Sequence, residues 1–353
     1  MSDPAWMIYG ANGYTGKLAA EKAASLGKKP VLAGRREEAI RPLAERLGLP
    51  WRAFSLDSPQ EALEGLKGVS LVLHCAGPFS ATSKPMVDAC LKAGAHYLDI
   101  TGEIDVFETI HARTEEAKKA KCVLMPGVGF DVVPSDCLAA SVAKALPGAT
   151  ELEIAIAGFG SASPGTTKTA VEGIADGGKV RKNGKIVSVP PGNKTREALF
   201  PDGEKRFCVS MPWGDVSTAY YSTGVPNITV YFAMPRSVSI GMKLSRPFLP
   251  LFGLKPVQNF LKDQVEKRVK GPSETERKRG KVYLWARAAD GKGKSVEGTL
   301  EVPEGYTFTV DAALACAERV LAGEVPGGAW TPSKAFGADF VTRLPGTKMA
   351  VRN

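Results

Sequence analysis

Three glycines lie three residues apart near the start of the chain, at Gly10, Gly13 and Gly16. They follow the apolar run 6–9 and precede a stretch of helical composition at 17–26. In a strand, loop and helix of this kind, the first glycine permits a tight turn, the second lets backbone approach a phosphate, and the third lets the helix pack on the strand. The N-terminus of the helix then faces an anion with free N–H groups and a positive dipole end.

This spacing predicts a loop that cradles the pyrophosphate of a dinucleotide, although a glycine-rich turn without function has the same pattern. The residues that we assign to the loop are Gly10, Asn12, Gly13, Tyr14, Thr15 and Gly16.

Basic residues stand where the ribose of the dinucleotide is expected. The second apolar run, 30–33, ends in Gly34, Arg35 and Arg36, about twenty residues after the glycine loop. An NAD-binding protein places an acidic residue here, on the ribose 2′-hydroxyl. An arginine suits a 2′-phosphate instead, through a charge-assisted and often bidentate contact. The sequence therefore predicts NADP rather than NAD, with two solvated arginines at a strand end as the alternative.

Later strand ends add small and polar residues to this predicted cofactor site. The apolar run 69–75 passes into a loop at 76–79, where small residues would let the nicotinamide ribose lie against backbone. A structural turn is the alternative explanation for that loop. The residues assigned to the cofactor from these later segments are Asp57, Ala76, Gly77, Pro78, Phe79 and Gly102.

Catalytic side chains are harder to find. The predicted proton donors or carbonyl-polarising groups all lie near an expected strand end or helix start; they are Asp131, Tyr97, Lys168, Glu103 and Ser135. Asp131 comes first, since a carboxylate in an apolar setting can have a raised pKa, but it could equally tie its loop through backbone hydrogen bonds. Lys168 belongs to a glycine and hydroxyl cluster at 158–169 that either binds a substrate carbonyl or only caps a helix.

Histidines and metal ligands give no further site. His74 is expected in the core and His111 on a solvated helix face, and no metal-ligand spacing occurs among the three histidines. We therefore predict no metal.

The elements that would position these residues alternate regularly. Short apolar strands alternate with helices over 1–135, which predicts an α/β fold with a Rossmann-type, doubly wound parallel sheet. An α+β domain with a mainly antiparallel sheet is expected over 136–308, with Ser135 or Asp136 capping its first helix. The C-terminal helix and tail, 309–353, are expected to return to the Rossmann domain. The strands expected in the second domain are 152–157, 207–211, 217–221, 228–234, 282–288 and 296–302.

Composition limits the class of protein. The net charge of +9 makes acidic partners or a membrane surface plausible, while no motif of nucleic-acid binding is present. Six scattered cysteines are typical of reduced core thiols, and with no secretory signal or bilayer-spanning run they favour a cytoplasmic location. The segment 237–269 is rich in apolar residues broken by prolines and interspersed with basic residues. Core or lid, hydrophobic substrate channel and peripheral membrane contact all stay open for it.

Four motifs together resemble a known family. They are the segments 10–16, 76–79, 96–103 and 129–136, supported near the end by 331–337. The chain resembles the saccharopine dehydrogenase-like oxidoreductases, particularly their trans-acting enoyl reductase branch. This resemblance implies an NADP-dependent oxidoreductase, most like an enoyl reductase that acts in trans on a hydrophobic acyl or polyketide-type substrate, free or bound to an acyl carrier. The alternatives are a saccharopine-type imine reductase and a non-catalytic NADPH-binding sensor or lipid-surface adaptor. A homodimer is expected only by analogy.

Overall fold

The structure is a computed structural model that describes residues 5–158, 160–175 and 177–352. Its backbone contacts divide the chain into two compact units, which we call the first and the second unit. The first unit takes residues up to Asp131 together with Thr309–Ala335, and the second takes Val132–Phe308 together with the chain from Phe336 onward. The predicted C-terminal segment 309–353 is therefore shared between the two.

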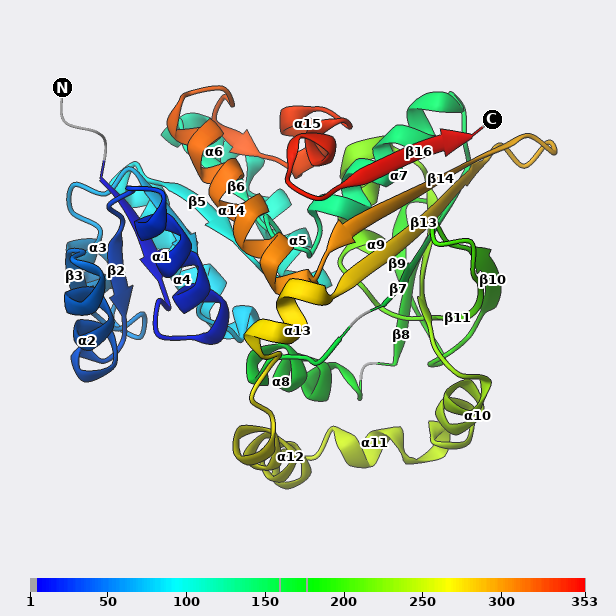
Figure 1. Ribbon diagram of the computed structural model, residues 1–353, viewed down its shortest axis with the longest axis horizontal. Coiled ribbons are helices and arrows are strands. Elements are labelled where there is room, and N and C mark those ends of the chain that lie inside the picture. Colours follow the sequence, from blue (N-terminus) through cyan, green and yellow to red (C-terminus); the bar gives the residue numbers. More distant parts are fainter. Residues whose placement is uncertain (1–4, 159, 176, 353) are drawn as a thin grey trace. The chain divides into compact units, whose positions relative to one another are not determined.

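The first unit contains a seven-stranded sheet in which all the described pairings are parallel (Figure 1). From one edge to the other the strands are β3 (Trp51–Ala53), β2 (Val31–Gly34), β1 (Trp6–Tyr9), β4 (Leu71–His74), β5 (His96–Asp99), β6 (Val123–Met125) and β15 (Gly328–Ala329). The order 3-2-1-4-5-6 is that of a doubly wound nucleotide-binding sheet. The predicted Rossmann-type sheet is thus confirmed.

Helices cover this sheet in two groups. The helices of the first unit are α1 (Tyr14–Ser25), α2 (Glu37–Leu47), α3 (Pro59–Gly65), α4 (Phe79–Ala93), α5 (Ile104–His111), α6 (Thr114–Ala120), most of α14 (Gly305–Leu321) and most of α15 (Pro332–Phe336). The first two pack on each other, while α3, α5 and α6 pack against α4. Strand runs such as 71–74 are buried throughout, as expected for parallel strands covered on both faces.

The second unit is built on a nine-stranded mixed sheet. Its main path is β10 (Thr195–Leu199), β11 (Lys205–Ser210), β12 (Asn227–Ala233), β7 (Glu151–Ala157), β13 (Lys281–Ala289), β14 (Ser295–Pro303) and β16 (Lys348–Arg352). The hairpin β8 (Gly178–Lys182) and β9 (Lys185–Val189) branches from β12. Only the β7–β12 pair is parallel among the described pairings, so the expected mainly antiparallel sheet is confirmed.

The remaining helices belong to this second unit. They are α7 (Val133–Ala145), α8 (Pro164–Gly173), α9 (Asp215–Thr223), α10 (Arg236–Leu244), α11 (Leu249–Phe252), α12 (Lys255–Arg268), α13 (Glu274–Arg279) and the 3-10 turns η1 (Arg246–Phe248) and η2 (Phe340–Arg343). Helix α7 packs on β13 and β14, and α9 packs on α7.

Three local predictions were wrong. The segment 217–221 is not a strand but part of α9, which ends at the left-handed Gly224, because burial against α7 overrides the β propensity of its threonine and tyrosines. Neither Ser135 nor Asp136 caps α7; the helix begins at Val133, so both lie inside its first turn. His111 is buried rather than solvated, and burial lowers the pKa of its imidazole to about 3.

The cysteines and the apolarity of the helices can be compared with the expectations from composition. All six cysteines are free thiols, and only Cys75 is not fully buried. Among the described residues, no helix is both long and apolar enough to cross a membrane.

Candidate active site at the carboxyl edge of the first sheet

The predicted cofactor residues follow strands of the parallel sheet, whose arrangement is seen in Figure 1, and lie at the carboxyl ends of those strands. Because every strand of this sheet is parallel, the segments that follow β1 to β6 all leave the sheet at its carboxyl edge. Ligands of open α/β sheets bind along this edge. The glycine loop, Arg35, Asp57, the loop 76–79, Gly102 and Asp131 are the predicted residues that the topology places there.

Steric crowding explains two of the loop glycines. Gly10 has φ +82°, and a Cβ atom on it would lie 2.7 Å from the backbone nitrogen of Ala76. A Cβ atom on Gly16 would lie 2.2 Å from the carbonyl oxygen of Gly10, where backbone cannot give way. The loop after β1 is therefore pressed between β4 and its own helix, as a phosphate cradle requires.

Helix α1 begins directly at this loop. Gly13 is its N-cap, with extended backbone and no side chain to bond the first turn, and the Gly13 N–H donates to the Gly10 carbonyl at 3.0 Å. The first turn of α1 contains no acidic residue. The helix dipole at this end is consequently not offset by a local carboxylate, which leaves it suited to an anion.

The end of β2 carries the predicted phosphate contact. Gly34 is packed so closely that a Cβ atom would lie 2.8 Å from Ile40 Cδ1 and 3.2 Å from Asn12 Oδ1, so the Asn12 side chain reaches from the glycine loop to this strand end. Arg35 follows, exposed, and no ion pair is found for it within the described chain. Arg36 differs, since its guanidinium lies 3.8 Å from the Glu38 carboxylate.

Arg35 and Asp57 act on the same buried hydroxyl. The Tyr9 hydroxyl donates to the Phe54 carbonyl at 3.0 Å, and burial raises the pKa of Tyr9 to about 12. The positive charge of Arg35 opposes this rise and the negative charge of Asp57 adds to it. Both predicted residues are therefore close enough to the end of β1 for their charges to be felt there.

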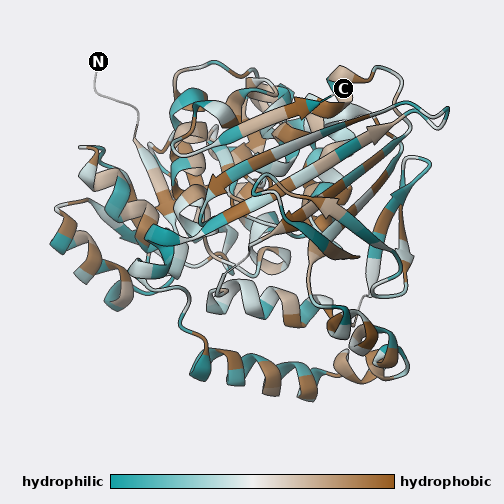
Figure 2. Ribbon diagram, turned by 45° about the vertical axis from the view of Figure 1, so that its right-hand side comes forward, coloured by the Kyte–Doolittle hydropathy of each residue, from teal (hydrophilic) through white to brown (hydrophobic). Residues whose placement is uncertain are grey.

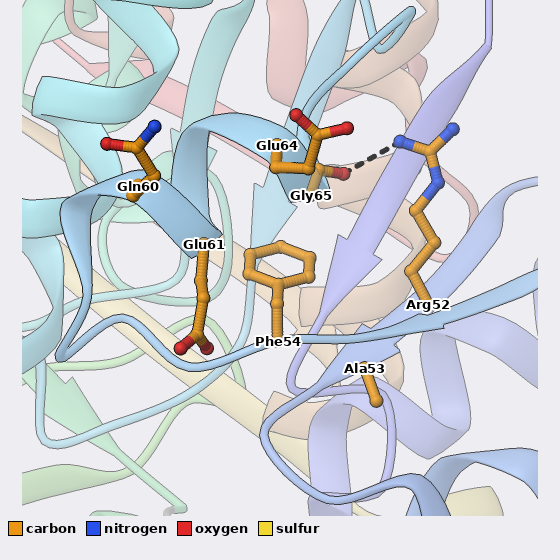
Figure 3. Close-up of a pocket in the computed structure, with 7 residues that line it drawn as sticks. All are labelled: Arg52, Ala53, Phe54, Gln60, Glu61, Glu64 and Gly65. Atoms are coloured by element: carbon orange, nitrogen blue, oxygen red, sulfur yellow. Dashed lines mark hydrogen bonds between the residues drawn. The ribbon is translucent and has the colours of Figure 1, made fainter.

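A second arginine in this corner is already used for structure (Figure 3). Arg52 on β3 donates to the carbonyls of Gly65 and Lys67, at 2.7 and 2.8 Å. It lines an open hollow of about 670 Å³ with Phe54, Glu61 and Glu64 among its other walls. The two carboxylates make this hollow unsuited to a phosphate. Arg35, rather than Arg52, is thus the arginine available to a 2′-phosphate.

The loop after β4 is held by residues from two other loops. The Glu103 carboxylate accepts hydrogen bonds from the N–H groups of Phe79 and Ser80, at 2.9 and 2.7 Å, and so caps α4 from a distance of more than twenty residues in sequence. The Thr82 hydroxyl donates to the Ala76 carbonyl at 2.6 Å and lies 3.0 Å from His74 Nε2. Burial lowers the pKa of His74 to about 3, so this imidazole stays neutral.

A buried carboxylate ties the ends of β5 and β6 together. Asp99 accepts from the Tyr97 hydroxyl at 2.7 Å and from the N–H groups of Thr101 and Gly127, both at 2.9 Å. Burial raises the pKa of Asp99 to about 6 against these hydrogen bonds. Tyr97 is 0% exposed, so its hydroxyl serves this tie and does not reach a substrate.

Asp131 lies against the loop after β5. A Cβ atom on Gly102 would lie 2.8 Å from Asp131 Oδ2, so a larger residue at 102 would have to displace this carboxylate. The turn that carries Asp131 is fixed from α14, where the Thr309 hydroxyl accepts from the Phe130 N–H at 2.9 Å. Asp131 is half-buried at the carboxyl edge of the sheet, next to a predicted cofactor residue.

A family model decides the identity of this unit. Residues 6–125 match the model described as the saccharopine dehydrogenase NADP binding domain. This part of the chain is a saccharopine dehydrogenase-type NADP-binding domain. This match confirms the predicted NADP-binding domain of the saccharopine dehydrogenase type over these residues, and the relatives of the chain are oxidoreductases.

Two curated proteins are similar to parts of this chain. It is 28% identical over 215 residues to the saccharopine dehydrogenase-like oxidoreductase of Mus musculus, which covers 52% of this chain and 49% of that protein. It is 35% identical over 138 residues to the trans-acting enoyl reductase of Mycobacterium tuberculosis, which covers 37% of this chain and 33% of that protein. The matched region thus spans about half or less of the length of these relatives.

A solved structure shares the fold over the whole chain. Saccharopine dehydrogenase (L-Glu forming) from Saccharomyces cerevisiae, solved in its apo form, matches with a TM-score of 0.67 over 99% of this chain and 100% of that one. Its sequence identity is 11%, so the match establishes the fold alone.

The residues of the NADP-binding domain fit the cofactor by their own geometry. A crowded glycine loop at a helix N-terminus suits a pyrophosphate, and an exposed arginine at the next strand end, with no ion pair among the described residues, suits a 2′-phosphate. The predicted assignment of individual cofactor contacts beyond these stays a prediction.

Lys168 lies on α8, in the second unit. Its ammonium forms an ion pair with the Glu266 carboxylate of α12. The hydroxyl cluster before it caps α8: Ser163 accepts from the Thr166 N–H, and the Ser163 N–H donates to the Tyr306 hydroxyl at 2.5 Å. Phe159 of the predicted cluster lies outside the described residues. The contacts of this segment support its structural alternative, a capped helix.

Asp99 and Thr309 are positioning residues that sequence reasoning did not assign, and Glu103, predicted as a proton donor or carbonyl-polarising group, takes a positioning role in the structure. Glu103 is visible as a polar residue after a strand, but its role as the cap of α4 depends on a contact with a loop more than twenty residues earlier. Thr309 acts on a turn 179 residues before it, and no local pattern signals that contact.

Proposed function

We propose that this chain is an NADPH-dependent reductase that acts in trans on the enoyl group of a hydrophobic acyl or polyketide-type substrate. The observation that carries the proposal is the crowded Gly10–Gly16 cradle followed at the end of β2 by the exposed Arg35, which has no ion pair among the described residues, in an NADP-binding domain. The enoyl specificity is favoured by the 35% identity to the mycobacterial enoyl reductase over 138 residues.

The chemistry divides between cofactor and protein. Bound NADPH supplies a hydride to the β-carbon of an enoyl thioester, and the α-carbon must take a proton. Asp131, in the first unit, is a half-buried carboxylate beside the predicted site residue Gly102, and we assign it as the proton donor or as the group that orients a donating water. Arg35 and the glycine loop bind and orient, while Glu103 and Asp99 hold the loops in place.

Substrate delivery is a matter of charge in this proposal. The net charge of +9 would steer an acidic acyl carrier protein toward the enzyme, and this attraction weakens as salt is added. A carrier-bound thioester should therefore show a salt-dependent kcat/KM that a small free thioester lacks.

Two assays on the purified full chain test the proposal. Titration with NADPH and NADH measures the cofactor preference, and NADPH oxidation is followed with enoyl thioesters of increasing chain length and with pairs of a keto acid and an amine. Turnover of the enoyl thioesters supports the proposal. Turnover of the keto acid and amine pairs alone would replace it with a saccharopine-type imine reductase, and tight binding without any turnover would replace it with a sensor or adaptor.

A further inference from the structure

The second unit carries an apolar surface that remains exposed among the described residues. Seven of the twelve exposed large apolar side chains among the described residues lie within residues 238–260. They are Val238, Ile240, Leu244, Phe248, Leu251, Leu254 and Phe260. We call residues 236–270 the strap; α10, η1, α11 and α12 follow one another along the lower edge of Figure 1, and Figure 2 shows brown bands along these helices.

Helix α10 exposes most of its large apolar residues. Ile240 and Leu244, one turn apart, are 58% and 71% exposed, while the residue that the helix buries is Ser239, at 3%. A helix of a soluble protein normally buries its apolar stripe and exposes its polar residues. The reversal in α10 indicates an apolar environment on its outer side.

Polar contacts hold the strap in this orientation. The Arg246 guanidinium donates to the Pro191 carbonyl at 2.8 Å, and Arg236 lies 3.2 Å from the Glu197 carboxylate. At the other end, the Gln258 amide donates to the Val171 carbonyl at 3.0 Å and Lys262 pairs with Glu172 at 2.6 Å. These polar contacts help to attach the strap, while the seven large apolar side chains named above stay exposed.

The strap is also strongly basic. It contains eight lysines and arginines against two acidic residues, which is six of the nine net positive charges of the whole chain. Lys243, Lys255 and Lys267 are exposed, and no ion pair is found for them within the described residues. Apolar side chains interspersed with unpaired lysines match the boundary of an anionic lipid bilayer, where acyl chains and negative headgroups meet.

We propose that the strap is a docking surface for an anionic phospholipid bilayer. Charge decides against a second copy of this chain, because a two-fold interface would place the same basic surface against itself and interfaces are depleted in lysine. An acidic protein would complement the charge but would need a shaped surface for seven apolar side chains, which lipid does not. The inference does not depend on the cofactor or the substrate.

Vesicle sedimentation tests this inference on the full chain. One set of vesicles contains phosphatidylcholine alone, and the other contains equal parts of phosphatidylcholine and phosphatidylserine. We expect co-sedimentation with the second set and little with the first. The triple variant Leu244→Ser, Phe248→Ser, Leu251→Ser should reduce the bound fraction at least tenfold, and Lys243→Glu with Lys255→Glu should reduce the partition coefficient roughly fivefold or more per lysine.

Matched controls separate the strap from general effects. Leu26→Ser and Leu199→Ser remove leucines of similar exposure, 53% and 49%, from outside the strap, and Lys292→Glu removes an exposed lysine from the β13–β14 turn. These controls should bind vesicles as the wild type does. NADPH titration and circular dichroism of each variant report whether it is folded, so a loss of lipid binding is distinguishable from a loss of structure.

Four outcomes would overturn the proposal. They are absence of binding to either set of vesicles, equal binding to both, binding that the triple variant retains, and a stable dimer in sedimentation velocity that the same triple variant dissociates. The last result would assign the strap to a second copy. Failure of NADPH binding in the wild type would contradict the proposed function without touching this inference.

Discussion

Removal of Arg35 is the most direct test of the cofactor assignment. Arg35 is exposed and has no ion pair within the described residues, so Arg35→Ala leaves no buried group without a partner. Surface changes of this kind usually alter the free energy of unfolding by less than about 0.5 kcal/mol. Any large effect on NADPH binding therefore reports a contact with the cofactor rather than damage to the fold.

The magnitude follows from the type of contact. A hydrogen bond to a charged group contributes about 1.5–3 kcal/mol, and exposure of Arg35 to solvent favours the lower end of that range. Because about 1.4 kcal/mol corresponds to a factor of ten, the dissociation constant of NADPH should rise roughly tenfold to thirtyfold. The dissociation constant of NADH should change by less than about twofold, since it has no 2′-phosphate. Isothermal titration calorimetry with both cofactors measures the two constants.

A neighbouring arginine provides the control. Arg41 on α2 is also exposed, but its guanidinium lies 2.7 Å from the Glu45 carboxylate and 3.6 Å from that of Glu37. Arg41→Ala removes the same formal charge from the same unit, and it should leave the ratio of NADPH to NADH affinity unchanged. If the ratio of NADPH to NADH affinity is the same in the wild type and in Arg35→Ala, the assignment of Arg35 to the 2′-phosphate is refuted. If Arg35→Ala and Arg41→Ala lose the same NADPH affinity, the effect is one of long-range charge rather than of contact.

Three further predictions follow from the geometry. Gly16→Ala should abolish measurable NADPH binding and lower the free energy of unfolding by about 1–3 kcal/mol, because the new Cβ would lie 2.2 Å from the Gly10 carbonyl oxygen. The control Gly173→Ala, which has open space around it, should change neither quantity. Calorimetry measures the binding and urea melts measure the stability. Asp131→Asn should lower kcat for an enoyl thioester on the order of a hundredfold or more while the dissociation constant of NADPH stays unchanged; equal kcat values would remove Asp131 from the mechanism. Asp215, buried at the start of α9, has its pKa raised to about 8 by burial and secondarily by the charge of Asp136. In the folded protein the Asp215 carboxyl keeps its proton up to about pH 8, whereas in the unfolded chain it loses the proton above about pH 4. Between these pH values the free energy of unfolding of the wild type should therefore fall, by at most about 1.4 kcal/mol per pH unit from this group. Asp215→Asn should flatten that slope in urea melts taken across the window, and an unaltered slope would contradict the raised pKa.

The features that could be predicted are those that short stretches of chain determine. A strand, a crowded glycine turn and a helix are consecutive in sequence, so residue types alone are enough for Gly10–Gly16 and Arg35 to indicate the cofactor. Ser58 is likewise an identifiable cap, and it accepts from the Glu61 N–H at 3.2 Å. In each case the partners that determine the local geometry lie within one supersecondary unit.

The features that could not be predicted depend on distant contacts. Helix α4 begins at Phe79, where the carboxylate of Glu103 from a later loop caps it, and no local pattern signals that contact. His111 ends an amphipathic helix and resembles a surface residue, yet it is buried within reach of the charge of Lys334, more than two hundred residues later. Helix α9 has the composition of a strand, and the contact that decides its structure is with α7.

A cofactor site and an acyl-binding site therefore differ in how well residue types alone predict them. A loop that binds a pyrophosphate must pack closely against its own helix. At Gly16 any side chain would collide with the Gly10 carbonyl, so cofactor binding restricts this position to glycine, which can be recognised in the sequence. Binding an acyl chain requires only apolar volume, which many combinations of leucine, phenylalanine and methionine provide equally well. The cofactor can be inferred from a few glycines and one arginine, whereas the substrate has to be found by assay. The strap illustrates the same asymmetry: its apolar composition is evident in the sequence, but only the outward orientation of Ile240 and Leu244 distinguishes a docking surface from ordinary core.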